Sequence, residues 1–549
     1  MGGKIVFLGC VFLLALTSGI AQGQTGDVSA LFEQAGRYED DANFAAAEAL
    51  YKQIVADYPQ TADGLEAQEK LTILYIEQDK SGEADAAFDE MVTVFSEFEG
   101  LAKAVDHVAD AYRELKHYEQ ARDTYRYAVM SWPEAEHAAD SQRAIALTSI
   151  LLGDEPNSEA AINKLLSDFG SYPNIATVVD HLADDLRELK RYEQARRLYQ
   201  HVVDNYPQAD YAMNCLGGVV RTSILLNDEP NAAAGTDRLF GEFAGRGGAA
   251  KAIDNIADCY RESARYEEAR KLYKRAVATW PTSRYAMESQ KGYVLCSIAL
   301  TDDPNAAAGT SEMLRSFANN ADLATGLYDV AAGYEKAACY EKAKNTYSRV
   351  VEIFPGSVAA SKAELDIAKT DIMSLIDIVD DSTVQEEIEF LFEHFNGDSY
   401  LPKAVFGVAR EYGVRAFLGT REGLARERGD YARAALPFLD KVITNFPDDA
   451  VVPEALEWAG DCHRLLGEYE QAISFYERTL DDWPKHEYAA RAQFLIGHVY
   501  EKMKREGLID EADADGKIWS AYKRVVTKYQ GSVFVKAAQD WLACHKNDN

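Results

Sequence analysis

The chain has 549 residues, which is enough for three or four ordinary domains or for one long array of repeated units. Its hydrophobic fraction of 47%, its 14 prolines and its lack of long Gly/Ser-rich stretches exclude a mainly disordered protein. With 57 Lys and Arg against 90 Asp and Glu, the formal charge of −33 disfavours nucleic acids and anionic membranes as partners and favours basic or neutral ones.

The amino terminus has the pattern of a secretory signal peptide. A lysine precedes an apolar run from Ile5 to Leu16, and the small residues Gly19 and Ala21 suit a cleavage site. Removing residues 1–21 would leave a mature chain with a charge of −34. The apolar run continues past Cys10, which disfavours lipid attachment there, although cleavage and lipidation both stay open. We therefore expect an exported protein of the periplasm or cell envelope of a bacterium, with no transmembrane span in the mature chain.

Three sequence markers recur with a period of 74 residues. The first is an aromatic residue followed by proline, the second is an aromatic residue with alanine three positions later, and the third is an Asp-Glu/Asp-Pro-Asn run. Three independent markers at one spacing indicate an internal repeat. The prolines of the first marker are Pro59, Pro133, Pro207, Pro281 and Pro355, and the asparagines of the third are Asn157, Asn231 and Asn305.

The segment from Lys103 to Pro133 shows what one unit contains. Its apolar residues follow the i, i+3, i+4, i+7 spacing of two amphipathic helices. Proline ends the second helix, because it cannot continue the hydrogen-bond ladder. The aromatic residues at apolar positions are expected in the core and not in a ligand cage. The two stripes are Val105, Val108 and Tyr112, then Tyr118, Ala121, Tyr125 and Ala128.

This pattern resembles the tetratricopeptide repeat, with Val108-Ala109-x-x-Tyr112 followed by Ala121, Tyr125, Ala128 and Pro133. The resemblance implies an all-α fold: a right-handed superhelical solenoid of antiparallel helical hairpins, with a concave groove lined by the first helix of each hairpin. The residue pattern of the repeat is also similar to that of exported bacterial proteins of the BamD-like and Tol-Pal coordinator type. Since 74 residues is about twice the family's repeat length, each period should hold two hairpins. The second runs from Ala144 through a turn at 153–157 to a helix from Ser158 to Phe169.

The repeat predicts three regions along the chain. A signal peptide at 1–21 precedes five double-hairpin units at 22–415, the last of them irregular, because the next aromatic-proline pair after Pro355 comes 92 residues later. Residues 416–549 should form further hairpins with two insertions, near 419–429 and 505–516, and a capping helix at about 534–545. The six cysteines of the mature chain show no framework spacing and are expected as free thiols, most of them buried in helices.

A polar motif on the first helix of three successive units is the candidate binding surface. Two interpretations stay open: a ladder of Asp–Arg pairs on a solvated helix face, and a groove that holds basic or amide-rich segments of a partner. In the first copy, the arginine is expected between the two like-charged aspartates. The three copies are Asp106, His107, Asp110 and Arg113; Asp180, His181, Asp184 and Arg187; and Asp254, Asn255, Asp258 and Arg261.

Metal binding and catalysis have less support. His107 is expected to point away from the face of the two aspartates, which disfavours a metal site. Some proteins of the family clamp a partner's C-terminal carboxylate with Lys and Asn at these positions, and aspartate here disfavours such a ligand. The run from Glu511 to Ile518 resembles the core of a calcium loop. However, Glu511 and Tyr522 stand where Asp and Glu are required, so an acidic connecting loop is favoured and calcium binding stays open. The sequence holds no phosphate loop, nucleophile elbow or His-Glu-x-x-His run, so neither an enzyme nor a cofactor is expected.

The sequence therefore predicts a non-enzymatic protein-interaction scaffold of the cell envelope or periplasm, which binds partner segments in a concave acidic groove. The alternative is a glycan- or peptidoglycan-binding envelope protein whose exposed Tyr and Trp stack on sugars.

Overall fold

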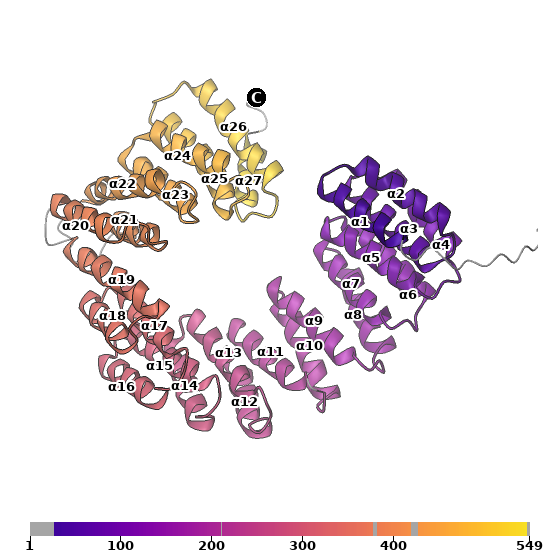
Figure 1. Ribbon diagram of the computed structural model, residues 1–549, viewed down its shortest axis with the longest axis horizontal. Coiled ribbons are helices and arrows are strands. Elements are labelled where there is room, and N and C mark those ends of the chain that lie inside the picture. The colour runs from indigo at the N-terminus through magenta and orange to yellow at the C-terminus, as the bar shows by residue number, and fades with distance from the viewer. Residues whose placement is uncertain (1–26, 210, 377–380, 419–426, 546–549) are drawn as a thin grey trace, which may run out of the picture. The chain divides into compact units, whose positions relative to one another are not determined.

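The computed structural model describes residues 27–209, 211–376, 381–418 and 427–545 (Figure 1). Within these ranges the chain forms 27 α-helices and no β-strand, which confirms the predicted all-α solenoid of helical hairpins. The chain divides into two compact units, Met1–Ala249 and Ala250–Asn549. The predicted signal peptide and Cys10 lie outside the described residues, and the boundary expected at residue 415 stays a prediction.

The first unit holds the hairpins built from α1 to α12. The bounds of these helices are α1 (Asp27–Asp40), α2 (Phe44–Asp57), α3 (Ala62–Glu77), α4 (Ser81–Val94), α5 (Leu101–Glu114), α6 (Tyr118–Ser131), α7 (Ala138–Leu151), α8 (Glu155–Asp168), α9 (Ile175–Glu188), α10 (Tyr192–Asn205), α11 (Ala212–Leu225) and α12 (Glu229–Glu242).

The second unit holds the helices from α13 to the carboxyl terminus. They are α13 (Ala249–Glu262), α14 (Tyr266–Thr279), α15 (Ala286–Ala299), α16 (Asp303–Ser316), α17 (Leu323–Lys336), α18 (Tyr340–Ile353), α19 (Val358–Leu375), α20 (Asp381–His394), α21 (Leu401–Leu418), α22 (Arg428–Asn445), α23 (Val452–Leu466), α24 (Tyr469–Asp482), α25 (Glu487–Arg505), α26 (Glu511–Lys528) and α27 (Val535–Cys544). None of the helices in the described ranges combines the length and the apolar character that crossing a bilayer requires.

From α5 to α18, each 74-residue period holds two hairpins of equal length. The odd-numbered helices from α5 to α17 start at residues 101, 138, 175, 212, 249, 286 and 323, so each hairpin spans 37 residues. The Asp-Glu/Asp-Pro-Asn marker begins α8, α12 and α16. Its first aspartate accepts a hydrogen bond from the backbone N–H three residues later, and its proline lies in the first turn, where a missing N–H costs nothing. Because of this cap, α8 starts at Glu155, earlier than the predicted Ser158.

In each unit the odd-numbered helices pack against one another. Contacts join α3 to α5 and α7 to α9 in the first unit, and α15 to α17 and α17 to α19 in the second. The even-numbered helices pack on the odd-numbered helix that precedes them, as α6 does on α5 and α24 on α23 (Figure 1). Polar side chains on one odd-numbered helix can therefore reach the next odd-numbered helix.

Tyrosines of the even-numbered helices fill the space between neighbouring hairpins. Tyr125, Tyr199 and Tyr273 are 1–2% exposed, which confirms the predicted core position for these tyrosines, whereas Tyr118 and Trp132 are half-buried. The next odd-numbered helix passes the rings of Tyr199 and Tyr273 with a glycine. A Cβ built on Gly218 would lie 2.7 Å from the ring of Tyr199, and one on Gly292 would lie 2.4 Å from the ring of Tyr273. Contact this close leaves room for glycine alone.

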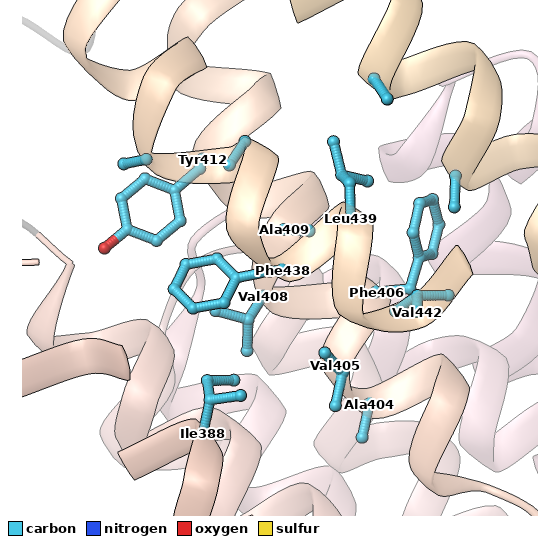
Figure 2. Packing of buried hydrophobic residues seen from close by; sticks show 14 of the residues in the cluster. Ile388, Ala404, Val405, Phe406, Val408, Ala409, Tyr412, Phe438, Leu439 and Val442 are labelled. Carbon is cyan, nitrogen blue, oxygen red and sulfur yellow. The ribbon is translucent and has the colours of Figure 1, made fainter. Parts of the chain in front are cut away.

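The loosening of the repeat after Pro355 corresponds to longer helices. α19, α21 and α22 have 18 residues each, against 14 in α5. Figure 2 shows side chains of three helices meeting in one apolar core, with Ile388 from α20, Val408 and Tyr412 from α21, and Phe438 from α22. The rings of Tyr412 and Phe438 stack with their centroids 5.6 Å apart. The hairpin packing therefore continues through the irregular interval.

The acidic run at Glu511 is helical, so the predicted connecting loop is wrong. Asp510 caps α26 by accepting hydrogen bonds from the backbone N–H groups of Ala512 and Asp513, which starts the helix at Glu511. Carboxylates in a first turn are also stabilised by the positive end of the helix dipole. Among the described residues, no group of three or more His, Cys, Asp or Glu side chains is arranged to hold a metal ion.

The predicted capping helix at the carboxyl end is α27. Its Trp541 packs on Tyr522 of α26, with ring centroids 5.2 Å apart. The six cysteines of residues 27–545 are free thiols, as expected, but only Cys215, Cys296 and Cys462 are buried; Cys259 and Cys339 are half-buried, and Cys544, at the end of this helix, is exposed.

Candidate functional site

The twelve candidate residues lie on α5, α9 and α13, at the same positions of each helix. The first two copies belong to the first unit and the third belongs to the second. Asp180 is buried, the other aspartates and the arginines are half-buried, and His107, His181 and Asn255 are exposed. The charged residues of the motif are therefore engaged within the repeat, and one position per copy is open to solvent.

The second aspartate of each copy joins the two helices of its own hairpin. Oδ1 of Asp110 accepts a hydrogen bond from the hydroxyl of Tyr125 at 2.5 Å and another from Nη2 of Arg113 at 2.7 Å. Burial raises the pKa of the Tyr125 hydroxyl, so the phenol keeps its proton and remains a donor. Arg113 pairs with Asp110 of its own helix, as the predicted ladder of Asp–Arg pairs requires. Its guanidinium also binds Tyr125 on α6, so it does not lie between the two aspartates.

This Asp–Tyr–Arg arrangement recurs in the other two copies and once more in the second unit. The last example was not predicted from the sequence, although its Asp-x-x-Arg motif stands at the same distance before a tyrosine. Asp184 binds Tyr199 at 2.5 Å and Arg187 at 3.2 Å, Asp258 binds Tyr273 and Arg261 at 2.6 Å each, and Asp461 binds Tyr476 at 2.8 Å and Arg464 at 2.9 Å.

The first aspartate of each copy joins successive hairpins. Oδ1 of Asp106 accepts a hydrogen bond from the hydroxyl of Ser141 on α7 at 2.7 Å, and Oδ1 of Asp254 accepts one from Ser289 on α15 at 2.6 Å. In the middle copy the donor is the thiol of Cys215, at 3.0 Å. Burial raises the pKa of Asp106 and Asp254 to about 6, because one hydrogen bond does not replace the lost water. Ionised at neutral pH, these carboxylates would be stabilised by a cation placed beside them.

The exposed position of the motif differs between copies. Nδ1 of His107 lies 2.8 Å from Oε1 of Glu69 on α3, in the preceding hairpin. His181 and Asn255 make no hydrogen bond through their side chains within the part of the chain that the structure describes. These two side chains are the members of the motif most available to a partner.

A pocket of about 210 Å³ opens among α5, α6 and α7, and the whole first copy of the motif lines it. Three carboxylates meet three cations there, together with two histidines. The pocket is therefore balanced in charge and not simply acidic as the sequence suggested. Its charged and histidine residues are Lys103, Asp106, His107, Asp110, Arg113, His137, Asp140 and Arg143.

The cation contributed by α7 is held in place by the next hairpin. Nη1 of Arg143 binds Oδ2 of Asp185 on α9 at 2.7 Å. In contrast, Oδ2 of Asp106 and Oδ2 of Asp110 accept no hydrogen bond from any described residue. The pocket thus combines fixed cations with carboxylate oxygens that retain the capacity to accept a donor from outside.

Three segments of the sequence match models of the tetratricopeptide repeat: residues 180–209, 252–285 and 424–487. The first two contain α10 and α14 with the tyrosines that bind Asp184 and Asp258. No curated protein matches the sequence.

Several solved structures are similar at low sequence identity. Naa15/Naa10 bound to HypK-THB has 16% identity and a TM-score of 0.30, covering 94% of this chain and 77% of that one. Tom70 from yeast has 11% identity and a TM-score of 0.33, covering 89% and 98%. The pilF protein of Pseudomonas aeruginosa has 19% identity and a TM-score of 0.24, covering 40% and 92%.

The hairpins, the aromatic-proline marker and the matched segments agree with one another, and the protein is therefore a helical-hairpin solenoid that contains tetratricopeptide repeats.

Proposed function

We propose that this protein is a non-enzymatic scaffold that holds a segment of a partner protein in the pocket of α5, α6 and α7. Proteins with tetratricopeptide repeats typically mediate protein–protein interaction. The observation that carries the proposal is the coincidence of two independent features: the polar motif found by its repetition in the sequence, and the pocket that this motif lines.

The size of the pocket favours a side chain over a whole small molecule. Its volume of about 210 Å³ is below the range of roughly 300–1,000 Å³ that is usual for ligand pockets. Protein interfaces commonly place a single large side chain in a small, well-lined pocket, with weaker contacts around it. We therefore infer that one anchoring side chain of the partner enters here, while neighbouring residues of the segment lie along α5 and α7.

The charges of the pocket favour a cationic or amide-bearing anchor. The half-buried carboxylate of Asp106 has one unused oxygen, and so does Asp110. A lysine, arginine or glutamine side chain would donate to both and would relieve the cost of keeping Asp106 ionised. The fixed guanidiniums of Arg113 and Arg143 would exclude a second cation, which limits the site to one such side chain.

Recovery of a partner by the purified full chain tests this proposal. We expect Asp106→Lys to abolish recovery and Asp106→Asn to weaken it, because asparagine still accepts from Ser141 but no longer attracts a cation. Asp123→Lys on α6 is the matched control, since Asp123 is exposed and lies outside the pocket. Equal recovery by all of these variants would contradict the proposal. Sedimentation of the chain with insoluble peptidoglycan, unaffected by high salt, would instead favour the glycan-binding alternative.

We also propose that the protein is exported to the periplasm or cell envelope of a bacterium. The support is the amino-terminal pattern of a lysine, the apolar run from Ile5 to Leu16 and small residues at Gly19 and Ala21. The mass of the amino-terminal peptide of the protein isolated from its host tests this. Cleavage after Ala21 is the expected result, and a chain that retains Met1 in a cytoplasmic fraction would contradict it.

A further inference from the structure

A second pocket, for which the proposed function has no use, lies among α24, α25 and α26 in the second unit. Its volume is about 650 Å³. α24 and α26 form its two walls, and residues of α25, including Gln493 and Tyr500, lie between them. It belongs to a hairpin pair far along the chain from the pocket of α5 to α7, and its residues are not part of the polar motif.

A glutamine recurs at one position of the repeat, and the copy that lines this pocket lacks the hydrogen bond made by the other copies. Four glutamines stand nine residues after the proline of an aromatic-proline pair: Gln68, Gln142, Gln290 and Gln493. The first three donate through Nε2 to a backbone carbonyl of the following even-numbered helix, at 2.9 Å in each case: Ala87, Ala161 and Gly309. All four side chains are buried, with exposed fractions between 1% and 6%.

Gln493 is the exception, because it makes no hydrogen bond with any described residue although it is only 4% exposed. Its hairpin is also longer than the equivalent one. α25 has 19 residues and α26 begins only at Glu511, whereas α7 has 14 residues and α8 follows it after three. The amide of Gln493 lines the pocket. Its hydrogen-bonding capacity is therefore available to a ligand in the pocket.

The wall formed by α26 is positively charged in an otherwise acidic chain. Residues 516–528 contain four Lys or Arg and no carboxylate, whereas the whole chain carries a charge of −33. Three of these cations, Lys517, Arg524 and Lys528, line the pocket. Lys517 is bound to Asp513 at 2.9 Å, but Arg524 has no carboxylate partner among the described residues. The hydroxyl of Tyr529, also in the pocket lining, is buried without a hydrogen bond.

We propose that this pocket binds an extended, acidic peptide segment of a partner protein. A backbone carbonyl of the segment accepts from Gln493, in the place that Ala161 occupies for Gln142. In an extended strand, successive side chains point to opposite sides. Acidic side chains on one side meet Arg524 and Lys528, and the alternate side chains face α24, where Glu477 and Asp481 favour neutral or basic residues. The pocket volume lies within the usual range of about 300–1,000 Å³ for ligand sites.

Fluorescence anisotropy with short labelled peptides tests the proposal on the full chain. The probe alternates Glu with Ala and is acetylated and amidated at its ends, and the comparison peptides carry Gln or Lys in place of Glu. We expect saturable binding of the Glu peptide, at least tenfold tighter than the Gln peptide. Equal binding of the Glu and Gln peptides, no saturable binding, or tighter binding of single-stranded oligothymidylate would overturn the proposal.

Single-residue variants distinguish specific binding in the pocket from non-specific attraction of the acidic peptide to positive charge. Arg524→Gln should weaken the Glu peptide at least tenfold, while Lys523→Gln, next to it on α26 but outside the pocket, should change affinity less than twofold. Gln493→Leu should also weaken binding, and it should leave the fold intact because it removes an amide that has no partner. Equal losses in the Arg524 and Lys523 variants would reject the site. Since none of these residues lines the α5 to α7 pocket, failure here leaves the proposed function of that pocket untouched.

Discussion

Replacing Asp106 by asparagine should stabilise the α5 to α7 region at neutral pH and much less at acidic pH. Burial raises the pKa of this carboxyl from an ordinary value of 3.8 to about 6. A difference of about two units corresponds to roughly 3 kcal/mol between the folded and unfolded states. Between these two pKa values the folded chain holds the proton more firmly than the unfolded chain, so stability is greatest in acid and falls as the pH rises towards 6. Asparagine stays neutral and still accepts the hydrogen bond of Ser141.

Local hydrogen exchange is the suitable assay, because a chain of this length does not unfold in one step. At pH 8 the opening free energy of α5 and α7 should rise by up to about 3 kcal/mol in Asp106→Asn, and at pH 4.5 by only about 1 kcal/mol. Asp123→Asn is the control, because Asp123 lies exposed on α6. A destabilised Asp106→Asn variant at pH 8, or a gain that does not depend on pH, would refute the assignment of a burial cost to this carboxylate.

Three further substitutions test how the hairpins are held together. Gly218→Ala should lower the thermal midpoint, with a local cost of about 1–3 kcal/mol, since the new methyl group would lie 2.7 Å from the ring of Tyr199; an unchanged midpoint would show that the ring moves freely. Tyr273→Phe should lower the opening free energy of α13 and α14 by about 1.5–3 kcal/mol, because the carboxylate of Asp258 loses the tyrosine hydroxyl that donates to it at 2.6 Å. Hydrogen-exchange rates equal to those of the wild type would contradict this. Lys369→Met should lower the free energy of unfolding by about 3–5 kcal/mol, because this lysine is 8% exposed and lies within 2.9 Å of two carboxylates that would lose their counter-charge. The expected result is loss of the helical circular-dichroism signal on mild heating, and melting at the wild-type temperature would refute it.

The fold was predictable because its signal is repeated and local. Apolar stripes and terminating prolines act within one helix, so the hairpins could be placed from their spacing alone. The start of α26 at Glu511 was not predicted, because it depends on the side chain of Asp510, which caps the helix. An acidic run by itself is equally compatible with a loop. The glycine opposite Tyr199 was missed because its importance appears only when two hairpins are packed together.

The candidate site was found by repetition, but its chemistry was only partly predictable. Spacing showed that Asp106 and Asp110 share one helix face, whereas their partners come from other helices. Ser141 lies 35 residues later and Tyr125 lies 15 residues after Asp110. Sequence spacing within one helix cannot reveal such contacts, and so the motif appeared more acidic than the pocket that it lines. Gln493 could not be singled out from the sequence either. Its position becomes informative only once the structure shows that the three equivalent glutamines each donate to a backbone carbonyl.

Photo-crosslinking from position 107 in intact cells tests the central claim most directly. His107 is exposed and lines the pocket of α5 to α7, so a benzoyl-phenylalanine placed there would contact any segment that enters it. Lys164 on α8, which is also exposed but outside the pocket, provides the control position. We expect one discrete protein adduct from position 107, none from position 164, and loss of the adduct when Asp106→Lys is added. The same adducts from both positions, or an adduct that survives Asp106→Lys, would contradict the account.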